Sequence, residues 1–446
     1  PLVDPIKQMT AVQTISHQLP HPECEQGSSS ICDPNNASYV DSFFCQLCSE
    51  LQHQSYFPHA PSYYGSFLGM KTEFEYDFID ECDYLLSTDG FHKNIGKVFT
   101  LNHETITSLN LTDKTSKLPP INLSEMDEEI ELGIIDCSEP LVSPLPALPT
   151  KQEDLTEICS SDSSNTDSDI DEDLYEDEQS PSFIARIKDY PTNIIALEKL
   201  DATLDSYLSK TELSDDELAS ISFQIIMALI VYGKVFDFTH NDLHTSNVMY
   251  VETPKKYLQY KYKGQYYRVP TFGKVYKIID FGRSIYRYGE LTMVSGNYKS
   301  GGDAAGLFNF GPVKSSNFKE QVPNKSFDLC RLGCSLFEFL ETGTLEPPRP
   351  DDRSARAMML RWCLNNKGKN MLYKQNGQER YPDFKLYKMI VKTVTSHDPE
   401  DEIQNPVFDK FKTIKKFIQK KSKLVNVDAF TPLYQNVGAP VKACVG

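Results

Sequence analysis

The 446-residue sequence is short of positive charge, of long apolar runs and of patterned cysteines. It has 45 Lys and Arg against 63 Asp and Glu, and the net charge of −18 argues against a nucleic-acid binder. We find no signal peptide and no apolar run long enough to span a bilayer, so we expect no membrane partner. The 11 cysteines show no disulfide framework, which favours an intracellular, cytoplasmic setting.

One C-x-x-C pair, Cys45 and Cys48, lies inside an apolar helical pattern. A zinc site would need a second pair at a suitable spacing, and the sequence has none. We therefore predict two buried helix cysteines rather than a metal site.

The hydrophobic pattern changes twice along the chain. Apolar residues recur at three- and four-residue steps over 39–54, which predicts an amphipathic helix, and 63–68 reads as a short strand. From 69 to 190 the pattern decays into short apolar pieces interrupted by prolines. Residues 151–180 hold 12 acidic residues and one lysine, too few apolar groups to offset the entropy of ordering. We predict a disordered acidic segment there, either a solvated spacer or a regulatory tail phosphorylated at Ser164, Thr166 and Ser168.

Regular patterns return after residue 190. We predict a buried strand over 193–200, a short helix over 201–208, and a long helix capped by Ser214 and ending near Val235. Tyrosines around Gly264 predict an extra hairpin, read as an exposed aromatic hairpin rather than a partner-binding one. The remaining predictions are strands over 248–251 and 274–279, a long loop over 283–325, and helices over 326–340, 354–364, 383–395 and 407–420, the last with a lysine-rich face.

Two polar motifs lie among these elements. The first is His240-Asn-Asp242-Leu-His-Thr-Ser-Asn247, and the second is Asp280-Phe-Gly282 after an apolar strand. One carboxylate can accept the proton of an attacking hydroxyl, while the Asn amide oxygen and the second carboxylate can hold Mg²⁺ against phosphates. Because both motifs occur in this order between apolar strands, they predict a phosphoryl-transfer site.

With these motifs placed, the chain resembles the eukaryotic-type protein kinases, and most closely the serine/threonine kinases of large nucleocytoplasmic DNA viruses (irido- and mimivirus-like). The likeness covers about 190–345 well and 39–68 weakly, and it does not explain 70–185. The segments that carry it are Glu198-Lys-Leu-Asp-Ala-Thr-Leu204, Asn241-Asp-Leu-His244, Val269-Pro-Thr-Phe-Gly273, Lys277-Ile-Ile-Asp-Phe-Gly-Arg283, Gly301-Gly-Asp303, Phe308-Asn-Phe-Gly-Pro312 and Ser326-Phe-Asp-Leu-Cys-Arg331.

The resemblance implies an α+β, bilobal kinase-like fold. Residues 1–68 would form a partial small lobe, 69–190 a long, largely disordered insertion, and 191–446 the hinge and the large lobe. The small lobe would be incomplete. The implied function is a serine/threonine protein kinase that transfers the γ-phosphoryl group of Mg-ATP to an unidentified protein substrate, in a host cell if the chain is viral.

The resemblance also implies roles for individual residues. Asp242 would be the catalytic base, Asn247 would act beside it, and Asn247 and Asp280 would bind Mg²⁺. His240 and Phe281 would belong to a buried spine, and Asp328 would anchor the backbone of the catalytic loop. The ATP cofactor would contact Leu197, Glu198, Leu200, Met249 and Asp280, with the Glu198 carbonyl and the Leu200 amide at the adenine edge.

The sequence departs from the family in three places. The glycine-rich loop and the phosphate-binding lysine are not visible, so we expect them upstream of Pro1, or else an incomplete ATP site. Asp41 and Glu50 are both candidates for the acidic partner of that lysine. Asn241 stands where many kinases have Arg, which predicts activity without phosphorylation of the activation segment. His244 stands where protein kinases usually have lysine.

Two other functions stay open at this point. One is a pseudokinase that acts as a scaffold through the hairpin near Gly264 and the 70–185 segment. The other is a small-molecule phosphotransferase of the haspin-like or aminoglycoside-kinase-like type, because Asp-Leu-His-x-x-Asn also occurs there.

Overall fold

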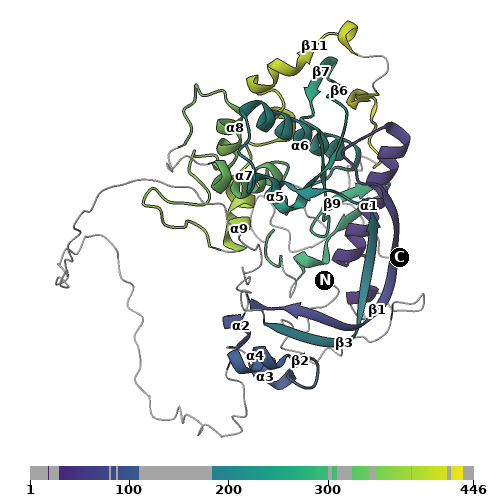
Figure 1. The fold of residues 1–446 in the computed structure, drawn as a ribbon, viewed down its shortest axis with the longest axis vertical. Helices are drawn as coiled ribbons and strands as arrows, with labels where there is room; N and C mark the ends of the chain where they lie inside the picture. The colour runs from purple at the N-terminus through teal and green to yellow at the C-terminus, as the bar shows by residue number, and fades with distance from the viewer. Residues whose placement is uncertain are drawn as a thin grey trace, which may run out of the picture.

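The computed structural model describes Leu19 and residues 30–79, 82–86, 89–109, 183–299, 304–308, 324–340, 347–382, 384–418 and 423–434. Within these ranges helices and strands are mixed, so the expected α+β class is confirmed (Figure 1). The predictions for the acidic segment 151–180 lie outside the described residues.

A long antiparallel hairpin connects distant parts of the chain. Strand β1 (Tyr63–Asp77) pairs with β3 (Ile184–Leu197) from Tyr63↔Leu197 to Asp77↔Ile184. The predicted strand over 63–68 therefore continues to Asp77. The predicted strand over 193–200 is present as far as Leu197, where β3 ends. The prediction that it is buried is wrong, because this part of β3 is mostly half-buried and Ile194 is 59% exposed.

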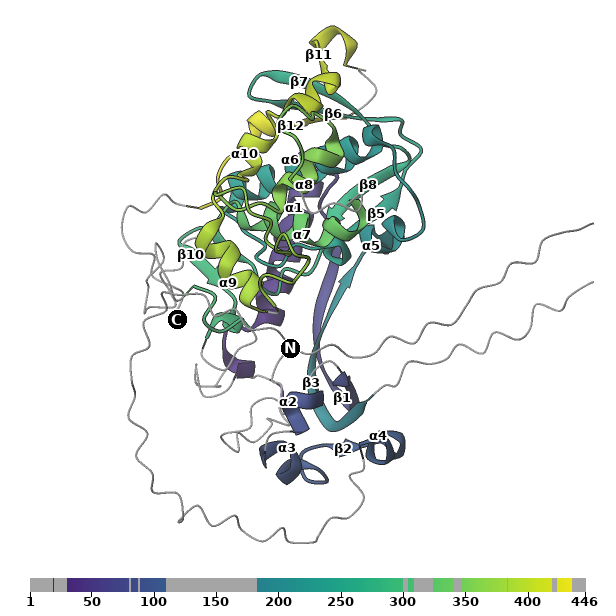
Figure 2. The ribbon, with the colours of Figure 1, turned by 90° about the vertical axis from the view of Figure 1, so that its left-hand side faces the viewer.

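The far end of the hairpin carries a small core of its own (Figure 2). Helices α2 (Cys82–Leu86), α3 (Asp89–Asn94) and α4 (His103–Ser108) gather there with the short strand β2 (Thr100–Leu101), which pairs with β3. The buried aromatic side chains of this core are Phe78, Phe91, Phe99 and Tyr190. The segment that the sequence pattern left unassigned thus contains an ordered unit before residue 110.

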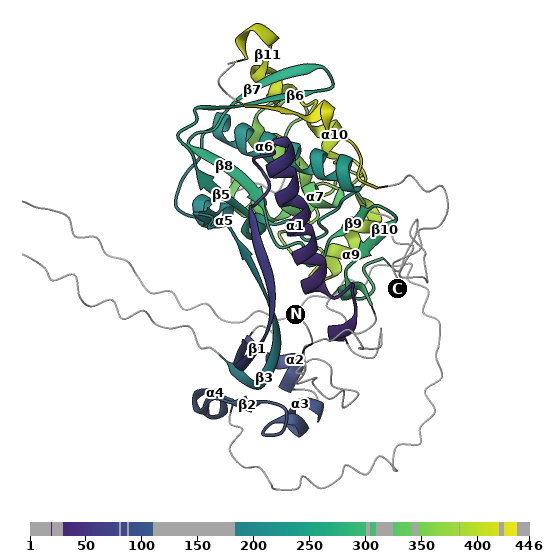
Figure 3. The same cartoon turned by 90° about the vertical axis from the view of Figure 1, so that its right-hand side faces the viewer.

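Helix α1 (Ala37–Ser55) runs beside the hairpin and packs against the main core (Figure 3). Its Asn36 cap accepts a hydrogen bond from the N–H of Ser38, so the predicted helix is confirmed. Cys45 and Cys48 are buried and unbridged, as predicted. Cys32, in contrast, is disulfide-bonded, which the sequence analysis did not anticipate.

Helix α6 (Asp215–Phe236) forms the centre of the main core. Ser214 caps it by accepting from the N–H of Glu217, as predicted. Its length and composition would let it cross a membrane, so the expectation that no apolar run is long enough is wrong. However, 89% of the most apolar stretch of this helix is buried within the protein, as in the core helix of a globular fold. Two short elements precede it, β4 (Ala202–Thr203) and α5 (Leu204–Leu208).

Two sheets pack near α6. In one, the strand order is β4-β5-β8, with β5 (Val248–Glu252) antiparallel to β8 (Lys274–Ile278). In the other the order is β11-β7-β6-β12, built on β6 (Tyr257–Tyr262) and β7 (Gln265–Pro270) and flanked by β11 (Lys412–Thr413) and β12 (Leu424–Asn426).

The tyrosine hairpin β6–β7 is not the exposed hairpin predicted from the sequence. Tyr260, Tyr262 and Tyr267 are buried. The ring of Phe223 in α6 lies 5.3 Å from the ring of Tyr260 and 5.1 Å from that of Tyr267, so the hairpin packs on the core helix.

Helices α7 (Phe327–Leu340), α8 (Ala355–Trp362) and α9 (Phe384–Thr393) lie in the C-terminal half. Between the motif Asp280-Phe-Gly282 and α7 lies a short hairpin, β9 (Ile285–Tyr288) and β10 (Leu291–Val294). The next helix, α10 (Pro399–Glu402), is only one turn long.

The predicted helix over 407–420 is wrong. The chain there forms a 3-10 helix over Pro406–Phe411, the short strand β11, and a second 3-10 turn over Lys415–Phe417. The pairing of Lys412 and Thr413 with β7 interrupts the helical pattern, because residues in a strand cannot keep helical hydrogen bonds.

Candidate active site

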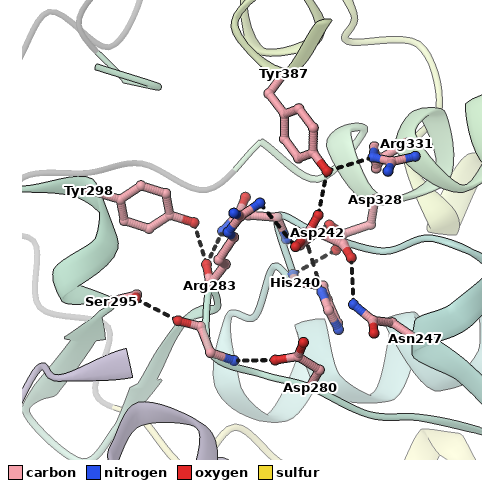
Figure 4. Close-up of polar contacts among 12 residues, drawn as sticks. His240, Asp242, Asn247, Asp280, Arg283, Ser295, Tyr298, Asp328, Arg331 and Tyr387 are labelled. Atoms are coloured by element: carbon pink, nitrogen blue, oxygen red, sulfur yellow. Dashed lines mark hydrogen bonds and ion pairs between the residues drawn. The ribbon is translucent and has the colours of Figure 1, made fainter. Parts of the chain in front are cut away.

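The two polar motifs lie side by side because neighbouring strands carry them. Asn247 directly precedes β5, and its carbonyl accepts a hydrogen bond from the N–H of Ile279, just after β8, at 3.0 Å. The ring Nε2 of His240 lies 2.9 Å from the carbonyl oxygen of Ile279. Asp242, Asn247 and Asp280 are thereby brought to one site (Figure 4).

The carboxylate of Asp328, at the start of α7, holds the backbone of the first motif. One of its oxygens accepts from the N–H of His240 and the other from the N–H of Asn241, both at 2.8 Å. Asp328 is buried, and burial raises its pKa while the two backbone hydrogen bonds oppose that rise. The contact that the resemblance implied for Asp328 is present.

Both motifs contain a residue with left-handed backbone geometry. The φ angle is 62° at Asn241 and 61° at Asp280. Asn and Asp tolerate this region better than other side chains, yet it costs free energy that surrounding contacts must offset. At Asn241 the side-chain amide supplies such contacts, since Nδ2 lies 3.1 Å from Thr239 Oγ1 and 3.2 Å from the carbonyl of Arg283.

The side chain of Asp242 is only 16% exposed and has a partner at each oxygen. The hydroxyl of Tyr387 donates to Oδ1 at 2.6 Å, and the Nη1 of Arg283 lies 3.0 Å from Oδ2. Nδ2 of Asn247 donates to the main-chain carbonyl of Asp242 at 3.0 Å, which ties the two motif residues together.

Asn247 and Asp280 offer oxygen atoms of the type that Mg²⁺ prefers. The amide nitrogen of Asn247 is engaged with Asp242, which leaves its Oδ1 for a ligand. One oxygen of Asp280 accepts from the N–H of Gly282 at 3.3 Å, and the side chain is exposed. Among the described residues no cluster of three His, Cys, Asp or Glu is arranged for a metal, so phosphate oxygens would have to complete this set.

The two candidate acids of α1 lie in different surroundings. Asp41 faces the Asp280 turn, and its Oδ1 accepts from the N–H of Phe281 at 3.0 Å. Burial raises the pKa of Asp41 to about 6, and the nearby charge of Asp280 adds to the rise. Glu50 is exposed and accepts from Gln54 on the same helix. The structure therefore brings Asp41, and not Glu50, to the site.

The residues expected around adenine lie at the end of β3 and on β5. Leu197 packs against the main core, and Met249 pairs with Lys277 across β5 and β8. Among the described residues, neither the Glu198 carbonyl nor the Leu200 N–H makes a hydrogen bond.

The Glu198 side chain forms an ion pair that the sequence analysis missed. Its carboxylate is bound by the ammonium group of Lys277, which also donates to the carbonyl of Ala60 at 3.0 Å. Lys277 is buried, and burial lowers its pKa while Glu198 opposes this. The pair ties the end of β3 to the strand that precedes Asp280.

Three further residues of the site were not anticipated: Arg283, Arg331 and Tyr387. A sequence signal existed for Arg331, because it follows Asp328 by three residues and so shares its helix face. No signal existed for Tyr387, which lies 145 residues after Asp242.

Comparison with known proteins gives short matches. A probable serine/threonine-protein kinase of Dictyostelium discoideum is 38% identical over 79 residues, covering 16% of this chain and 6% of that protein. An uncharacterized protein of Caenorhabditis elegans is 28% identical over 65 residues, covering 15% of this chain and 22% of that protein. No family model matches the chain. The chain thus has a short similarity to a probable kinase and spans a small part of either relative.

Proposed function

We propose that this protein is a serine/threonine protein kinase that transfers the γ-phosphoryl group of Mg-ATP to a protein hydroxyl. The observation that carries the proposal is the hydrogen bond from Ile279 to Asn247, which joins the two motifs. Asp328 of α7 in addition holds the backbone of the first motif. That arrangement gathers a base, an amide and a second carboxylate. The short similarity to a probable serine/threonine kinase points the same way.

In the proposed reaction Asp242 orients the acceptor hydroxyl and takes up its proton. An ionised carboxylate has about four lone-pair sites, so its contacts to Tyr387 and Arg283 leave room for a third donor. The substrate oxygen then attacks phosphorus as the bond to the leaving ADP oxygen breaks. Catalysis of this kind is mainly positioning and charge stabilisation.

Asn247 and Asp280 are the residues we assign to Mg²⁺. When bound, the metal supplies positive charge beside the phosphate oxygens. Asp280 has a positive φ, and the N–H of Gly282 donates to one oxygen of its carboxylate, so the other oxygen is left for the metal. At the adenine end we assign the carbonyl of Glu198 and the N–H of Leu200, with Leu197 and Met249 as apolar walls.

His244 bears on the choice between protein and small-molecule acceptors. It is half-buried, and burial lowers its pKa, so the imidazole is neutral at pH 7 and carries no charge comparable to a lysine. We nevertheless favour a protein acceptor, because the long segment between Asp280 and α7 suits an extended substrate.

The test begins with ATP binding by the whole chain. We expect binding that requires Mg²⁺ and is lost in Asp280→Ala, measured by titration calorimetry. Asp280→Asn keeps one oxygen ligand and should retain part of the affinity. Binding without any dependence on Mg²⁺ or on residue 280 would contradict the site assignment.

Phosphate transfer separates the alternatives. We expect transfer to a casein-like protein, lowered at least about a hundredfold in Asp242→Asn with ATP binding retained. Mg-ATP binding without transfer to any acceptor would instead indicate a pseudokinase. Transfer to an aminoglycoside but not to protein would indicate a small-molecule phosphotransferase.

A further inference from the structure

We propose that Tyr387 is a positioning residue, which fixes the Asp242 carboxylate through a hydrogen-bonded chain from Arg331 to Tyr387 to Asp242. The inference rests on the proposed function, because it concerns the base of that reaction. It assigns a role to α9, an element that the motifs do not include.

The chain of contacts is short and directional. Nε of Arg331 donates to the hydroxyl oxygen of Tyr387 at 2.9 Å, and that hydroxyl donates to Oδ1 of Asp242 at 2.6 Å (Figure 4). Burial raises the pKa of Tyr387, so the phenol keeps its proton at neutral pH and remains a donor. The guanidinium of Arg331 has no acceptor atom, which sets the direction of the chain.

Packing fixes the ring of Tyr387 independently of its hydroxyl. The ring stacks on Phe384 with centroids 5.5 Å apart and lies 5.9 Å from the ring of Phe327. The guanidinium of Arg331 also lies 5.2 Å from the ring centroid. A hydroxyl on a ring held in this way is a fixed donor, so little entropy is lost when it binds the carboxylate.

Helix α7 is the common support of the loop and of this chain. Asp328, Arg331 and Ser335 follow one another at steps of three and four residues and therefore share one face. Asp328 holds the backbone of the loop, Arg331 holds Tyr387, and Ser335 Oγ accepts from the N–H of Thr245 at 3.1 Å. One face of one helix thus supports both the backbone and the side-chain partner of Asp242.

The carboxylate needs such support because its last torsion is soft. Rotation about the bond to an sp² carboxyl group has broad minima, so the intrinsic torsional preference does not set this angle. Tyr387 at Oδ1 and Arg283 at Oδ2 hold the two oxygens from different sides. The remaining lone pairs then face a defined direction, in which an acceptor hydroxyl can be received.

The experiment compares Tyr387→Phe with the wild-type chain in steady-state phosphate transfer to a casein-like protein. We expect kcat to fall about tenfold or more, because hydrogen bonds to charged groups are stronger than those between neutral groups. The KM for ATP should stay within about twofold, since Tyr387 touches none of the residues assigned to ATP. Tyr381→Phe, which removes a phenol hydroxyl six residues earlier, is the matched control and should leave kcat unchanged.

A double-mutant cycle separates positioning from a general loss of structure. Arg331→Met should lower kcat by a similar factor, and the double variant should lose no more than either single variant, because both act through one contact. In the Asp242→Asn background, Tyr387→Phe should have no further effect. Independent losses that multiply would overturn the inference, as would a Tyr387→Phe variant with wild-type kcat.

An increase in kcat in Tyr387→Phe would overturn the inference in a different way, since it would make Tyr387 a block on substrate entry. Each of these results requires a wild-type chain that transfers phosphate, so the proposed function would stand while the inference fell. A wild-type chain that binds Mg-ATP but transfers no phosphate to any acceptor would remove both.

Discussion

The main-chain N–H of Phe281 donates to the carboxylate of Asp41 at 3.0 Å, although 240 residues separate them. This contact joins α1 to the turn that carries Asp280. Among the described residues no Lys or Arg forms an ion pair with Asp41, and only the ring of His240 lowers its pKa from a distance. Burial is the largest influence on the pKa of Asp41, and the hydrogen bonds from Phe281 and Cys45 oppose it only in part.

The first prediction concerns the pH dependence of stability. The pKa of Asp41 rises from the reference value of 3.8 to about 6 in the folded protein, so the native state binds this proton more tightly than the unfolded state. The contribution of Asp41 to the free energy of unfolding is therefore largest below about pH 4. It is lost as the pH rises from there through about 6. Asp41→Asn keeps an oxygen acceptor for Phe281 and removes the titration. As the pH rises from about 4 to 7, the free energy of unfolding of the variant should increase by about 3 kcal/mol relative to that of the wild type.

Urea denaturation at the two pH values measures this difference. Glu50→Gln, which removes a charge from the exposed side of the same helix, is the control. If the difference in the free energy of unfolding between Asp41→Asn and wild type does not change with pH, the pKa of Asp41 is not raised in the folded state.

The second prediction concerns the support of the catalytic loop by Asp328. Asp328→Ala leaves the N–H groups of His240 and Asn241 without their acceptor in a buried site. We expect the free energy of unfolding to fall by about 3 kcal/mol or more, since unsatisfied buried donors each cost about 1–3 kcal/mol. Asp328→Asn retains one acceptor oxygen, so its free energy of unfolding should lie between those of the wild type and Asp328→Ala.

Hydrogen exchange checks this prediction at the residues concerned. The amides of His240 and Asn241 should lose protection in Asp328→Ala to a greater extent than amides in the centre of α6. Unchanged protection at both positions would mean that the loop does not depend on this carboxylate.

The third prediction concerns helix packing at Gly333. A Cβ added there would lie 2.6 Å from Cβ of Trp362, so α7 and α8 could not keep their approach. Gly333→Ala should therefore cost about 1–3 kcal/mol, as overpacked cores do. Gly233→Ala in α6 places its Cβ where no atom beyond the neighbouring helix backbone lies within 4 Å. The better helix propensity of Ala should stabilise this variant by up to about 1 kcal/mol.

Thermal and urea unfolding of the two variants provide the comparison. The opposite signs make the test independent of any general effect of replacing glycine in a helix. Destabilisation of both variants by equal amounts would contradict the explanation from close packing.

Much of the local structure could be predicted from the sequence because its cause is local. The cap of Ser214 on α6 and the amphipathic pattern of α1 depend on residues within a few positions of each other. The order of Asp242, Asn247 and Asp280 along the chain indicated one site, since motifs of this kind join at neighbouring strands.

The errors arose where distant segments decide the outcome. The tyrosines around Gly264 indicated an exposed hairpin, but Tyr260 and Tyr267 are buried against Phe223 of α6. The pattern over 407–420 has helical spacing, but pairing of Lys412 and Thr413 with β7 gives a strand instead. In both cases tertiary packing outweighed local propensity.

The sequence by itself determined the chemical groups of this site and the loop and strand that present them. Only the tertiary structure decided which acid of α1 reaches Asp280, that Lys277 neutralises Glu198, and that Tyr387 and Arg283 hold the two oxygens of Asp242. Chain spacing carries no information about these contacts, because they form between distant segments. The packing of α1 and α7 into the main core, and of α9 against α7, brings these segments together.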